Sequence, residues 1–270
     1  MAIVLDARDL NKRFGAISAA SNVSAAIEQD SVVGLIGSNG AGKTTFINMI
    51  TGYIKPDTGS ILYQGCDIIG LSPREVTRIG ICRSFQVPQL FSSLSVFENM
   101  MVGLGVVLRN AGHGGFLSFD RPNVPGHDAP AEEVAERILM RFGLADYRNK
   151  NAQVLPGGIR KLLDIALAMI AKPTILLLDE PTSGVSAQEK FGIMDMVMTA
   201  IKAEGATILF VEHDMEVVSR FAQRVLAFNE GRIIADAAPE IALNDPEVKR
   251  YVVGGELRRM DEQQQGAKNA

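Results

Sequence analysis

The sequence lacks an excess of basic residues and a metal-binding cysteine pattern, and each absence argues against a class of protein. Its 27 lysines and arginines stand against 31 acidic residues, which gives a net charge of -4 and a pI near 5.5. Such a chain offers no basic surface, so sequence-independent binding to nucleic acid is disfavoured. The two cysteines, Cys66 and Cys82, fit no metal-ligand spacing, and we interpret them as reduced structural thiols.

Long apolar runs are also missing. The longest are VVGLIG, ILLL and MMVGLGVVL, which are well below the roughly 20 residues that a membrane-spanning helix needs. The stretch MAIVLDARDLNKRF has no basic region followed by a long apolar segment. These features predict a cytosolic chain, and its 270 residues, 47% of them apolar, can bury one large or two modest cores.

Three short apolar runs indicate an α/β fold with a mostly parallel sheet. Residues 31–36, 174–179 and 206–212 are nearly uniformly apolar and are bounded by glycine or proline, as strands buried on both faces are. Helical patterns lie between them, including one that follows residue 43 and closes at Gly52. Alternation of buried strands with helices predicts a layered α/β architecture.

Residues 87–156 differ in character and predict a mostly helical inserted subdomain. Helical patterns at 95–109 and 131–143 flank a loop rich in glycine and proline. His113 and His127 lie in this loop, and we interpret them as solvated histidines rather than a metal pair, because no third ligand recurs at ligand spacing. The polar end of the chain, GGELRRMDEQQQGAKNA, is expected to fray.

The stretch GSNGAGKTT matches the phosphate-loop pattern G-x-x-x-x-G-K-[ST] between a predicted strand and a predicted helix. In such loops, backbone N–H groups wrap the phosphates, the lysine reaches the β and γ phosphates, and the hydroxyl binds Mg²⁺. An ordinary glycine turn is the alternative. The predicted phosphate-binding residues are Gly37, Ser38, Asn39, Gly40, Ala41, Gly42, Lys43, Thr44 and Thr45.

Acidic residues and a histidine follow the other two predicted buried strands. Asp179 ends one strand and can hold Mg²⁺ through water, whereas Glu180 points elsewhere and can orient or deprotonate a water. His213 follows the third strand. Ligands of parallel sheets sit outside the carboxyl ends of strands, which favours a functional interpretation of Lys43, Asp179 and His213. A solvated strand end and a satisfied core histidine are the alternatives.

A glycine pair begins another helical pattern, in VLPGGIRKLLDIALAM at 154–169. Gly157 and Gly158 precede apolar residues at helical spacing, and a helix that starts in this way exposes N–H groups that bind anions. No Lys-Ser or Lys-Thr follows. The rest of a phosphate site here must therefore come from elsewhere.

The order of these motifs resembles that of the nucleotide-binding subunits of ABC transporters, over residues 3 to about 256. The resemblance places Phe14 at the adenine-stacking position, Gln86 at the Q-loop glutamine, Glu180 as the catalytic base and His213 as the switch histidine. It also implies that Thr44, Gln86 and Asp179 are the Mg²⁺ ligands. VLPGGIRK resembles the signature motif, whose glycines cap the γ-phosphate of ATP held by a second subunit.

The resemblance implies a fold and a division into domains. The expected fold is a P-loop NTPase (RecA-like) core with a mostly parallel sheet, an antiparallel β edge subdomain and an inserted α-helical signature subdomain. The core is expected at residues 1–86 and 157–240, and the helical subdomain at 87–156. A C-terminal helical extension and polar tail would occupy 241–270.

Softer similarities in residues 80–104, 175–189, 210–218 and 245–256 are to the ATPase subunits of importers for branched-chain amino acids and related small polar solutes. They imply an ATPase at the cytoplasmic face of the inner membrane that binds ATP and Mg²⁺, a second ATPase subunit and separate permease subunits, and serves a solute-binding protein indirectly. The alternatives are an ATPase of the lipopolysaccharide-export type, a soluble ABC ATPase of DNA repair or translation, and a small-molecule kinase.

The sequence departs from the family pattern at positions that bear on chemistry. Pro156 and Ile159 replace the usual serine and glutamine of the signature, and Ser186 replaces the carboxylate of the D-loop. One hypothesis is a heterodimer with two unequal sites, to which this chain contributes a weakened signature. The other is family drift with full activity.

Overall fold

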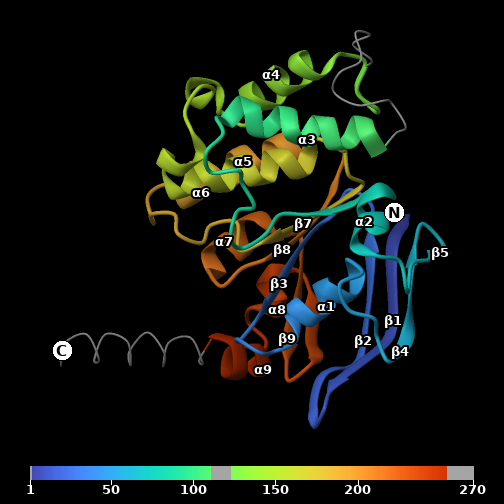
Figure 1. The fold of residues 1–270 in the computed structure, drawn as a ribbon. Helices are drawn as coiled ribbons and strands as arrows, with labels where there is room; N and C mark the ends of the chain where they lie inside the picture. The colour runs from blue at the N-terminus through green and yellow to red at the C-terminus, as the bar shows by residue number, and fades with distance from the viewer. Residues whose placement is uncertain (1, 111–122, 254–270) are drawn as a thin grey trace. The chain divides into compact units, whose positions relative to one another are not determined.

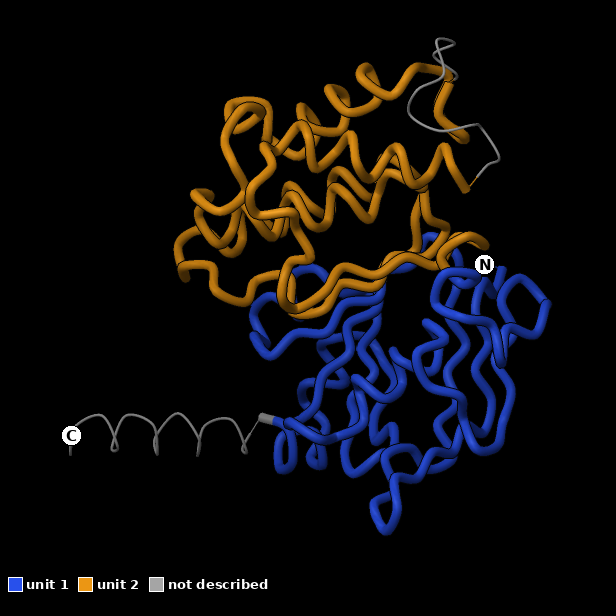
Figure 2. The backbone as a smooth tube through the Cα atoms, in the orientation of Figure 1, with its two compact units in different colours: residues 1–76, 209–270 blue, residues 77–208 orange. Residues whose placement is uncertain are grey.

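The computed structural model describes residues 2–110 and 123–253, and it divides into two compact units (Figures 1 and 2). Unit 1 comprises residues 1–76 and 209–270, and unit 2 comprises residues 77–208. His113 and the tail expected to fray lie outside the described residues. Within the described ranges, no helix is both long and apolar enough to traverse a bilayer. The predicted division into core, helical subdomain and C-terminal extension stays a prediction.

Unit 1 contains an antiparallel sheet, as the resemblance implied. Its strand order is β2-β1-β4-β5, and each neighbouring pair is antiparallel. In β2, Val23, Ala25 and Ile27 are buried while Ser24 between them is exposed, so one face of the strand packs on the core. The strands are β1 (Ile3–Phe14), β2 (Ile17–Glu28), β4 (Thr58–Tyr63) and β5 (Cys66–Asp67).

The rest of unit 1 surrounds the strand predicted at 31–36. This strand, β3 (Val32–Gly37), is buried at every residue, pairs in parallel with β9 and leads toward α1. The rings of Phe46 and Phe228 lie 5.6 Å apart and join α1 to β9. The other elements of this unit are α1 (Lys43–Ile50), α7 (Met215–Phe221), β9 (Arg224–Asn229), β10 (Arg232–Ala237), α8 (Pro239–Ala242), α9 (Pro246–Val248) and a π-helical turn, η3 (Lys249–Val253).

The predicted buried strands are confirmed in the second sheet. Its order is β10-β9-β3-β8-β7-β6, and β8 (Thr207–Val211) begins in unit 2 and ends in unit 1. The pairs β3·β9 and β6·β7 are parallel and β9·β10 is antiparallel. All residues of β8 and the first four of β7 (Ile175–Asp179) are buried, as the uniformly apolar patterns predicted.

Unit 2 carries the helices predicted between residues 87 and 170. In Figure 1, α3 lies beside α4 and α5, and a Cβ at Gly103 of α3 would come within 2.8 Å of Ile170 Cδ1. Helix α4 ends slightly earlier than predicted because Gly143 adopts φ 62°, a conformation suited to glycine at a helix end. The elements are α2 (Pro73–Arg78, which starts in unit 1), β6 (Ile81–Arg83), α3 (Val96–Asn110), α4 (Ala131–Arg141), η1 (Ala145–Tyr147), η2 (Ala152–Val154), α5 (Gly157–Met169), β7 and α6 (Lys190–Lys202).

The interpretation of His127 as a solvated loop residue is wrong. Its side chain is buried, and its ring Nε2 lies 2.9 Å from the backbone O of Ile170. A carbonyl can only accept, so the neutral Nε2–H tautomer donates this bond.

The two cysteines are both free, and they differ in burial. Cys66 is exposed, whereas Cys82 is buried, and burial raises the pKa of the Cys82 thiol to about 12.

His127 makes the stability of the fold depend on pH. Burial lowers the pKa of His127 below its usual value; the hydrogen bond to Ile170 opposes this, and Lys172, Arg137 and Arg141 add to it. Below pH about 6.5 the unfolded chain therefore binds more protons than the folded one, so stability falls as the pH falls. We expect urea unfolding to show a smaller loss of stability between pH 7.5 and 5.5 in His127→Gln, whose amide can still donate to Ile170. Identical losses in the two proteins would contradict this.

Candidate functional site

The phosphate-loop sequence of unit 1 links the buried end of β3 to the start of α1. Gly40 and Gly42 adopt φ 82° and 109°, which favour glycine. A Cβ at Gly37 would lie 2.5 Å from Phe228 O, and one at Gly42 would lie 2.8 Å from Ala19 O. Both obstacles are backbone atoms, so neither can move aside as a side chain would. The glycines are therefore required for the path of this loop.

The first turn of α1 is open to an anion. Gly42 is the N-cap residue, it makes no side-chain capping bond, and the first turn holds no acidic residue. The backbone N–H groups at such a helix start carry partial positive charge and have no intrahelical acceptor. Thr44 is exposed and Thr45 half-buried at this end. The helix start can therefore bind phosphate oxygens, with two hydroxyls beside it.

Lys43 is held over the same loop. Its side chain is buried, and Nζ donates to the backbone O of Gly37 and, at 3.1 Å, to the backbone O of Ser38. A buried ammonium needs such acceptors, because an unpaired one is costly. The bonds keep the positive charge beside the backbone of the loop, whose N–H groups can wrap a phosphate.

Unit 1 also carries two of the residues named by the resemblance. Phe14 ends β1 with its ring about half exposed, and the Nζ of Lys12 lies 5.7 Å from the ring centroid. An exposed aromatic ring at a strand end can stack on a base. His213 follows β8 and is half-buried, and the next residue, Asp214, caps α7 by accepting from Glu216 N at 3.0 Å. The cap fixes the direction of the chain directly after His213.

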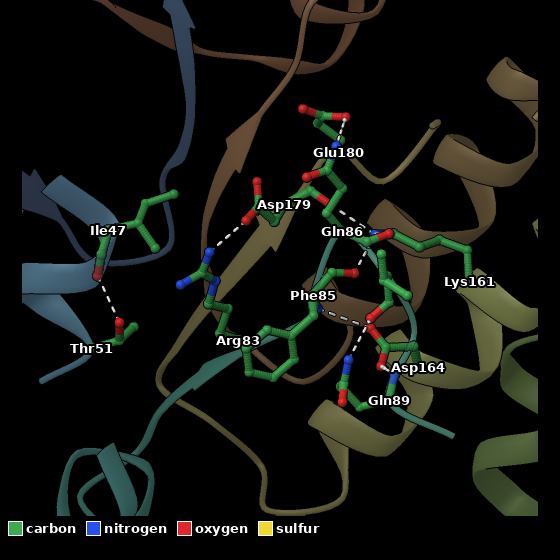
Figure 3. Close-up of polar contacts among 11 residues, drawn as sticks. Ile47, Thr51, Arg83, Phe85, Gln86, Gln89, Lys161, Asp164, Asp179 and Glu180 are labelled. Atoms are coloured by element: carbon green, nitrogen blue, oxygen red, sulfur yellow. Dashed lines mark hydrogen bonds and ion pairs between the residues drawn. The ribbon is translucent and has the colours of Figure 1, made fainter. Parts of the chain in front are cut away.

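Unit 2 brings Gln86 and Glu180 together. Gln86 Nε2 donates to Glu180 Oε2 at 2.8 Å, although the two residues are 94 positions apart in the sequence (Figure 3). The contact follows from the parallel pairing of β6 with β7, in which Arg83 is opposite Leu177. The two chain segments then leave the sheet at the same edge. Gln86 can thus hold the carboxylate that we predicted to orient or deprotonate water.

The neighbouring acid, Asp179, forms an ion pair. Arg83 Nη2 lies 2.5 Å from Asp179 Oδ2, and both side chains are largely buried. A charge-assisted bond of this length fixes the carboxylate at the end of β7. The Arg83 contact was not predicted from the sequence.

Glu180 has a strained backbone. Its φ is 46°, a left-handed conformation that is uncommon for a residue other than glycine, and it precedes Pro181. Ser183 N donates to the backbone O of Glu180 at 3.1 Å and holds the turn. Strain of this kind persists only where surrounding contacts impose it, and it is concentrated at functional sites.

The glycine pair begins α5, as predicted. Pro156 is the N-cap residue and makes no side-chain capping bond, and Gly157 is exposed. A Cβ at Gly158 would come within 2.7 Å of Ile193 Cδ1, so the pair lets the helix start approach α6 closely. The start of α5 therefore remains available for an anion.

Ser186 lies between β7 and α6, and its Oγ donates to Glu189 Oε2 at 2.6 Å.

The predicted site residues divide between the two units. The phosphate loop, Phe14 and His213 belong to unit 1; Gln86, Asp179, Glu180, Gly157 and Gly158 belong to unit 2. Among the residues that the structure describes, no group of three or more His, Cys, Asp or Glu side chains could hold a metal ion.

Comparison with known proteins gives consistent matches. Residues 20–183 match the family model described as ABC transporter. The high-affinity branched-chain amino acid transport ATP-binding protein LivG of Escherichia coli is 34% identical and covers 93% of this chain and 98% of its own. BraF of Pseudomonas aeruginosa, which has the same description, is 32% identical over 93% of this chain and 98% of its own.

Solved structures of related proteins also superpose on this chain. An ATP-binding cassette of an ABC transporter, in its ADP conformation, superposes with a TM-score of 0.75 at 29% identity, covering 93% of this chain and 98% of that one. The cbiO1 protein of Clostridium perfringens, part of the transporter complex cbiONQ, superposes with a TM-score of 0.77 at 27% identity, covering 93% and 94%.

Proposed function

Because this chain belongs to the ABC transporter family and is an ATPase whose ATP hydrolysis is coupled to transport, we propose that it powers an importer for branched-chain amino acids or related small polar solutes. The observation that carries the proposal is its similarity to LivG and BraF along nearly the whole of each chain. The chain would act at the cytoplasmic face of the membrane, with permease subunits providing the path for the solute. We favour this function over the lipopolysaccharide-export alternative, because LivG and BraF are described as branched-chain amino acid transport proteins.

We assign the residues of ATP hydrolysis as follows. The phosphate loop and Lys43 bind the phosphates, Phe14 stacks on adenine, and Glu180 accepts the proton of the attacking water, while Gln86 and His213 orient the reacting groups. The Gln86–Glu180 bond at 2.8 Å supports this pairing. The open start of α1 and the glycines of its loop support phosphate binding.

Mg²⁺ would be held by Thr44, Gln86 and Asp179. A hydroxyl, an amide oxygen and a carboxylate are the hard oxygen ligands that Mg²⁺ prefers, so these residues fit the ion. The ion would neutralise charge on the phosphates. Arg83 holds the Asp179 carboxylate at its place on β7.

A second ATPase subunit would complete the site through α5. The exposed start of that helix, at Gly157 and Gly158, would cap the γ-phosphate bound by the partner. Pro156 supplies no hydroxyl, and losing one charge-assisted bond would weaken closure by about 1.5 to 3 kcal/mol. Both hypotheses therefore remain: a heterodimer with unequal sites, or a homodimer in which the remaining contacts suffice.

The segment 86–101 would bind the permease. Val87 is 70% exposed and Phe91 56% exposed, and the buried Asn99 fixes the segment by accepting from Phe91 N at 2.9 Å and donating to Phe91 O at 3.1 Å. A backbone fixed in this way presents its apolar side chains to a partner rather than to its own core.

We expect Phe91→Asp to weaken association with the permease subunits by about 10- to 100-fold, since an aromatic side chain that becomes buried on binding contributes about 1.5 to 3 kcal/mol. ATP hydrolysis by the isolated subunit should be unchanged. Co-purification from detergent-solubilised membranes measures the association. Met140→Asp, which changes a similarly exposed apolar residue on α4, is the control and should bind as the wild type does. Equal binding by all three proteins would place the docking surface elsewhere.

Uptake measurements test the proposed function directly. The chain would be reconstituted in proteoliposomes with its co-expressed membrane subunits and binding protein, and uptake of labelled leucine, isoleucine and valine would be followed with and without ATP. Glu180→Gln should abolish uptake. ATP-dependent uptake of a different solute, with no uptake of these three, would leave an ABC importer but refute the substrate.

A further inference from the structure

Two charged side chains of α5 are buried, and neither is among the residues predicted to bind phosphate or metal or to act in catalysis. Lys161 is 2% exposed and Asp164 is 6% exposed. They are three positions apart and so share one face of the helix. Burial raises the pKa of the Asp164 carboxyl, and the N–H groups of Gln89 and Phe85 and the charge of Lys161 act in the opposite direction. Buried charges are stable only where they have hydrogen-bond or ion-pair partners, so the partners of Lys161 and Asp164 explain how α5 can bury both side chains.

Lys161 contacts two functional segments at once. Its Nζ donates to Phe85 O at 2.7 Å and to Asp179 O at 2.8 Å, with a longer contact of 3.5 Å to Gln86 O. Figure 3 shows the side chain reaching from α5 to the carbonyls beside Gln86 and at the end of β7. A single ammonium therefore joins the residue before Gln86 to the residue before Glu180.

Asp164 holds the same loop by accepting hydrogen bonds from the backbone N–H groups of the loop. Its Oδ2 accepts from Phe85 N at 3.1 Å and its Oδ1 accepts from Gln89 N at 3.0 Å. Both backbone groups of Phe85 are thus bonded to α5, and Gln89 anchors the other end of the loop. Gln86 and Val87 between these anchors are themselves exposed. The loop is therefore fixed through its backbone, not by burial of its side chains.

We propose that Lys161 and Asp164 are positioning residues for ATP hydrolysis. They fix the loop 85–89 and the end of β7 to the same helix, and so hold Gln86 against Glu180 at 2.8 Å. The proposal rests on the role assigned to Glu180. Because α5 begins at Gly157, the helix that would cap the second subunit's phosphate also sets the geometry of this chain's own catalytic carboxylate.

The test compares Lys161→Met with Lys161→Arg by steady-state ATP hydrolysis and by ATP binding. A misplacement of about 1 Å can cost about 100-fold in rate, so we expect kcat to fall by about 10- to 100-fold in Lys161→Met while the Kd for ATP is unchanged. Lys161→Arg keeps a cationic donor and should recover most of the rate. Lys202→Met, the same change at an exposed position of α6, is the control and should hydrolyse ATP normally.

A second measurement reports on the loop itself. The chain contains no tryptophan, so Val87→Trp introduces a single tryptophan as a fluorophore in the loop. Its fluorescence anisotropy should fall when Lys161→Met is added and should not change with Lys202→Met. If Lys161→Met does not fold, Asp164→Asn carries the same test, because an amide replaces one of its two acceptors with a donor that faces an N–H group.

Wild-type kcat in folded Lys161→Met would overturn the proposal, as would an unchanged anisotropy of the fluorophore introduced by Val87→Trp. A loss of rate that Lys161→Arg shares fully, without a change in anisotropy, would also overturn it. Failure of the role assigned to Glu180 appears separately, as full hydrolysis by Glu180→Gln. Failure of the ATPase function appears as no hydrolysis by the wild type.

Discussion

Glu180→Gln is expected to hydrolyse ATP about 100 to 10,000 times more slowly than the wild type, because an amide cannot accept the proton that a general base removes. ATP binding should persist, since the phosphate-loop residues are untouched. The local structure should persist too: the amide oxygen of the new residue can still accept from Gln86 Nε2, as Glu180 Oε2 does at 2.8 Å. Phosphate release at saturating MgATP and calorimetric ATP titration measure the two quantities.

The control for this prediction is Glu133→Gln, the same change at an exposed position in the first turn of α4, which should leave kcat unchanged. If Glu180→Gln hydrolyses ATP at the wild-type rate, Glu180 is not the base. A loss of ATP binding together with hydrolysis would instead assign it a binding role, because an interaction made only in the transition state lowers kcat without weakening the ground state.

Glu180→Gln also decides between the two hypotheses for the second subunit. With hydrolysis blocked, a closed nucleotide-bound dimer should accumulate if Gly157 and Gly158 can cap a phosphate without the usual serine. Light scattering that finds a dimer only with MgATP would indicate self-pairing. A monomer that still binds ATP would indicate that a different ATPase subunit completes the site, consistent with Pro156 removing a donor.

The parts of the fold that could be predicted from the sequence are those that local patterns determine. Strands β3, β7 and β8 are nearly uniformly apolar, and α1 and α5 show helical periodicity, so the sequence places each within about two residues of its observed bounds. The long strands β1 and β2 were expected only from the resemblance. Their pairing contains several register shifts, which interrupt the alternation that marks a strand.

The candidate site could be predicted as residues but not as contacts. Phosphate-loop residues are consecutive, so a pattern finds them. Gln86 and Glu180 are brought to the same edge of the sheet by the pairing of β6 with β7, which no local pattern specifies. The partner of the buried His127 is likewise distant in the sequence, the backbone carbonyl of Ile170. Lys161 and Asp164 are not singled out by the sequence, because their partners are backbone groups of another segment.

The other large effect is expected at the phosphate loop, where Gly42→Ala should strongly weaken ATP binding. Gly42 has φ 109°, and its added Cβ would lie 2.8 Å from Ala19 O and 3.1 Å from Gly231 Cα, so the backbone must shift where the loop enters α1. That shift would misplace the N–H groups at the start of the helix. Losing two bonds to phosphate at about 1.5 to 3 kcal/mol each would weaken binding by at least about 100-fold.

Gly192→Ala separates this effect from the general cost of adding a methyl group. Gly192 lies inside α6 with nothing within 4 Å of the added Cβ, so alanine should stabilise the protein by about 0.5 to 1 kcal/mol and leave ATP affinity unchanged. Calorimetric titration gives the affinity, and circular dichroism checks that Gly42→Ala is folded. A folded Gly42→Ala with wild-type affinity would mean that the loop binds nucleotide in a different conformation, and that the N–H groups at the start of α1 are not the phosphate ligands.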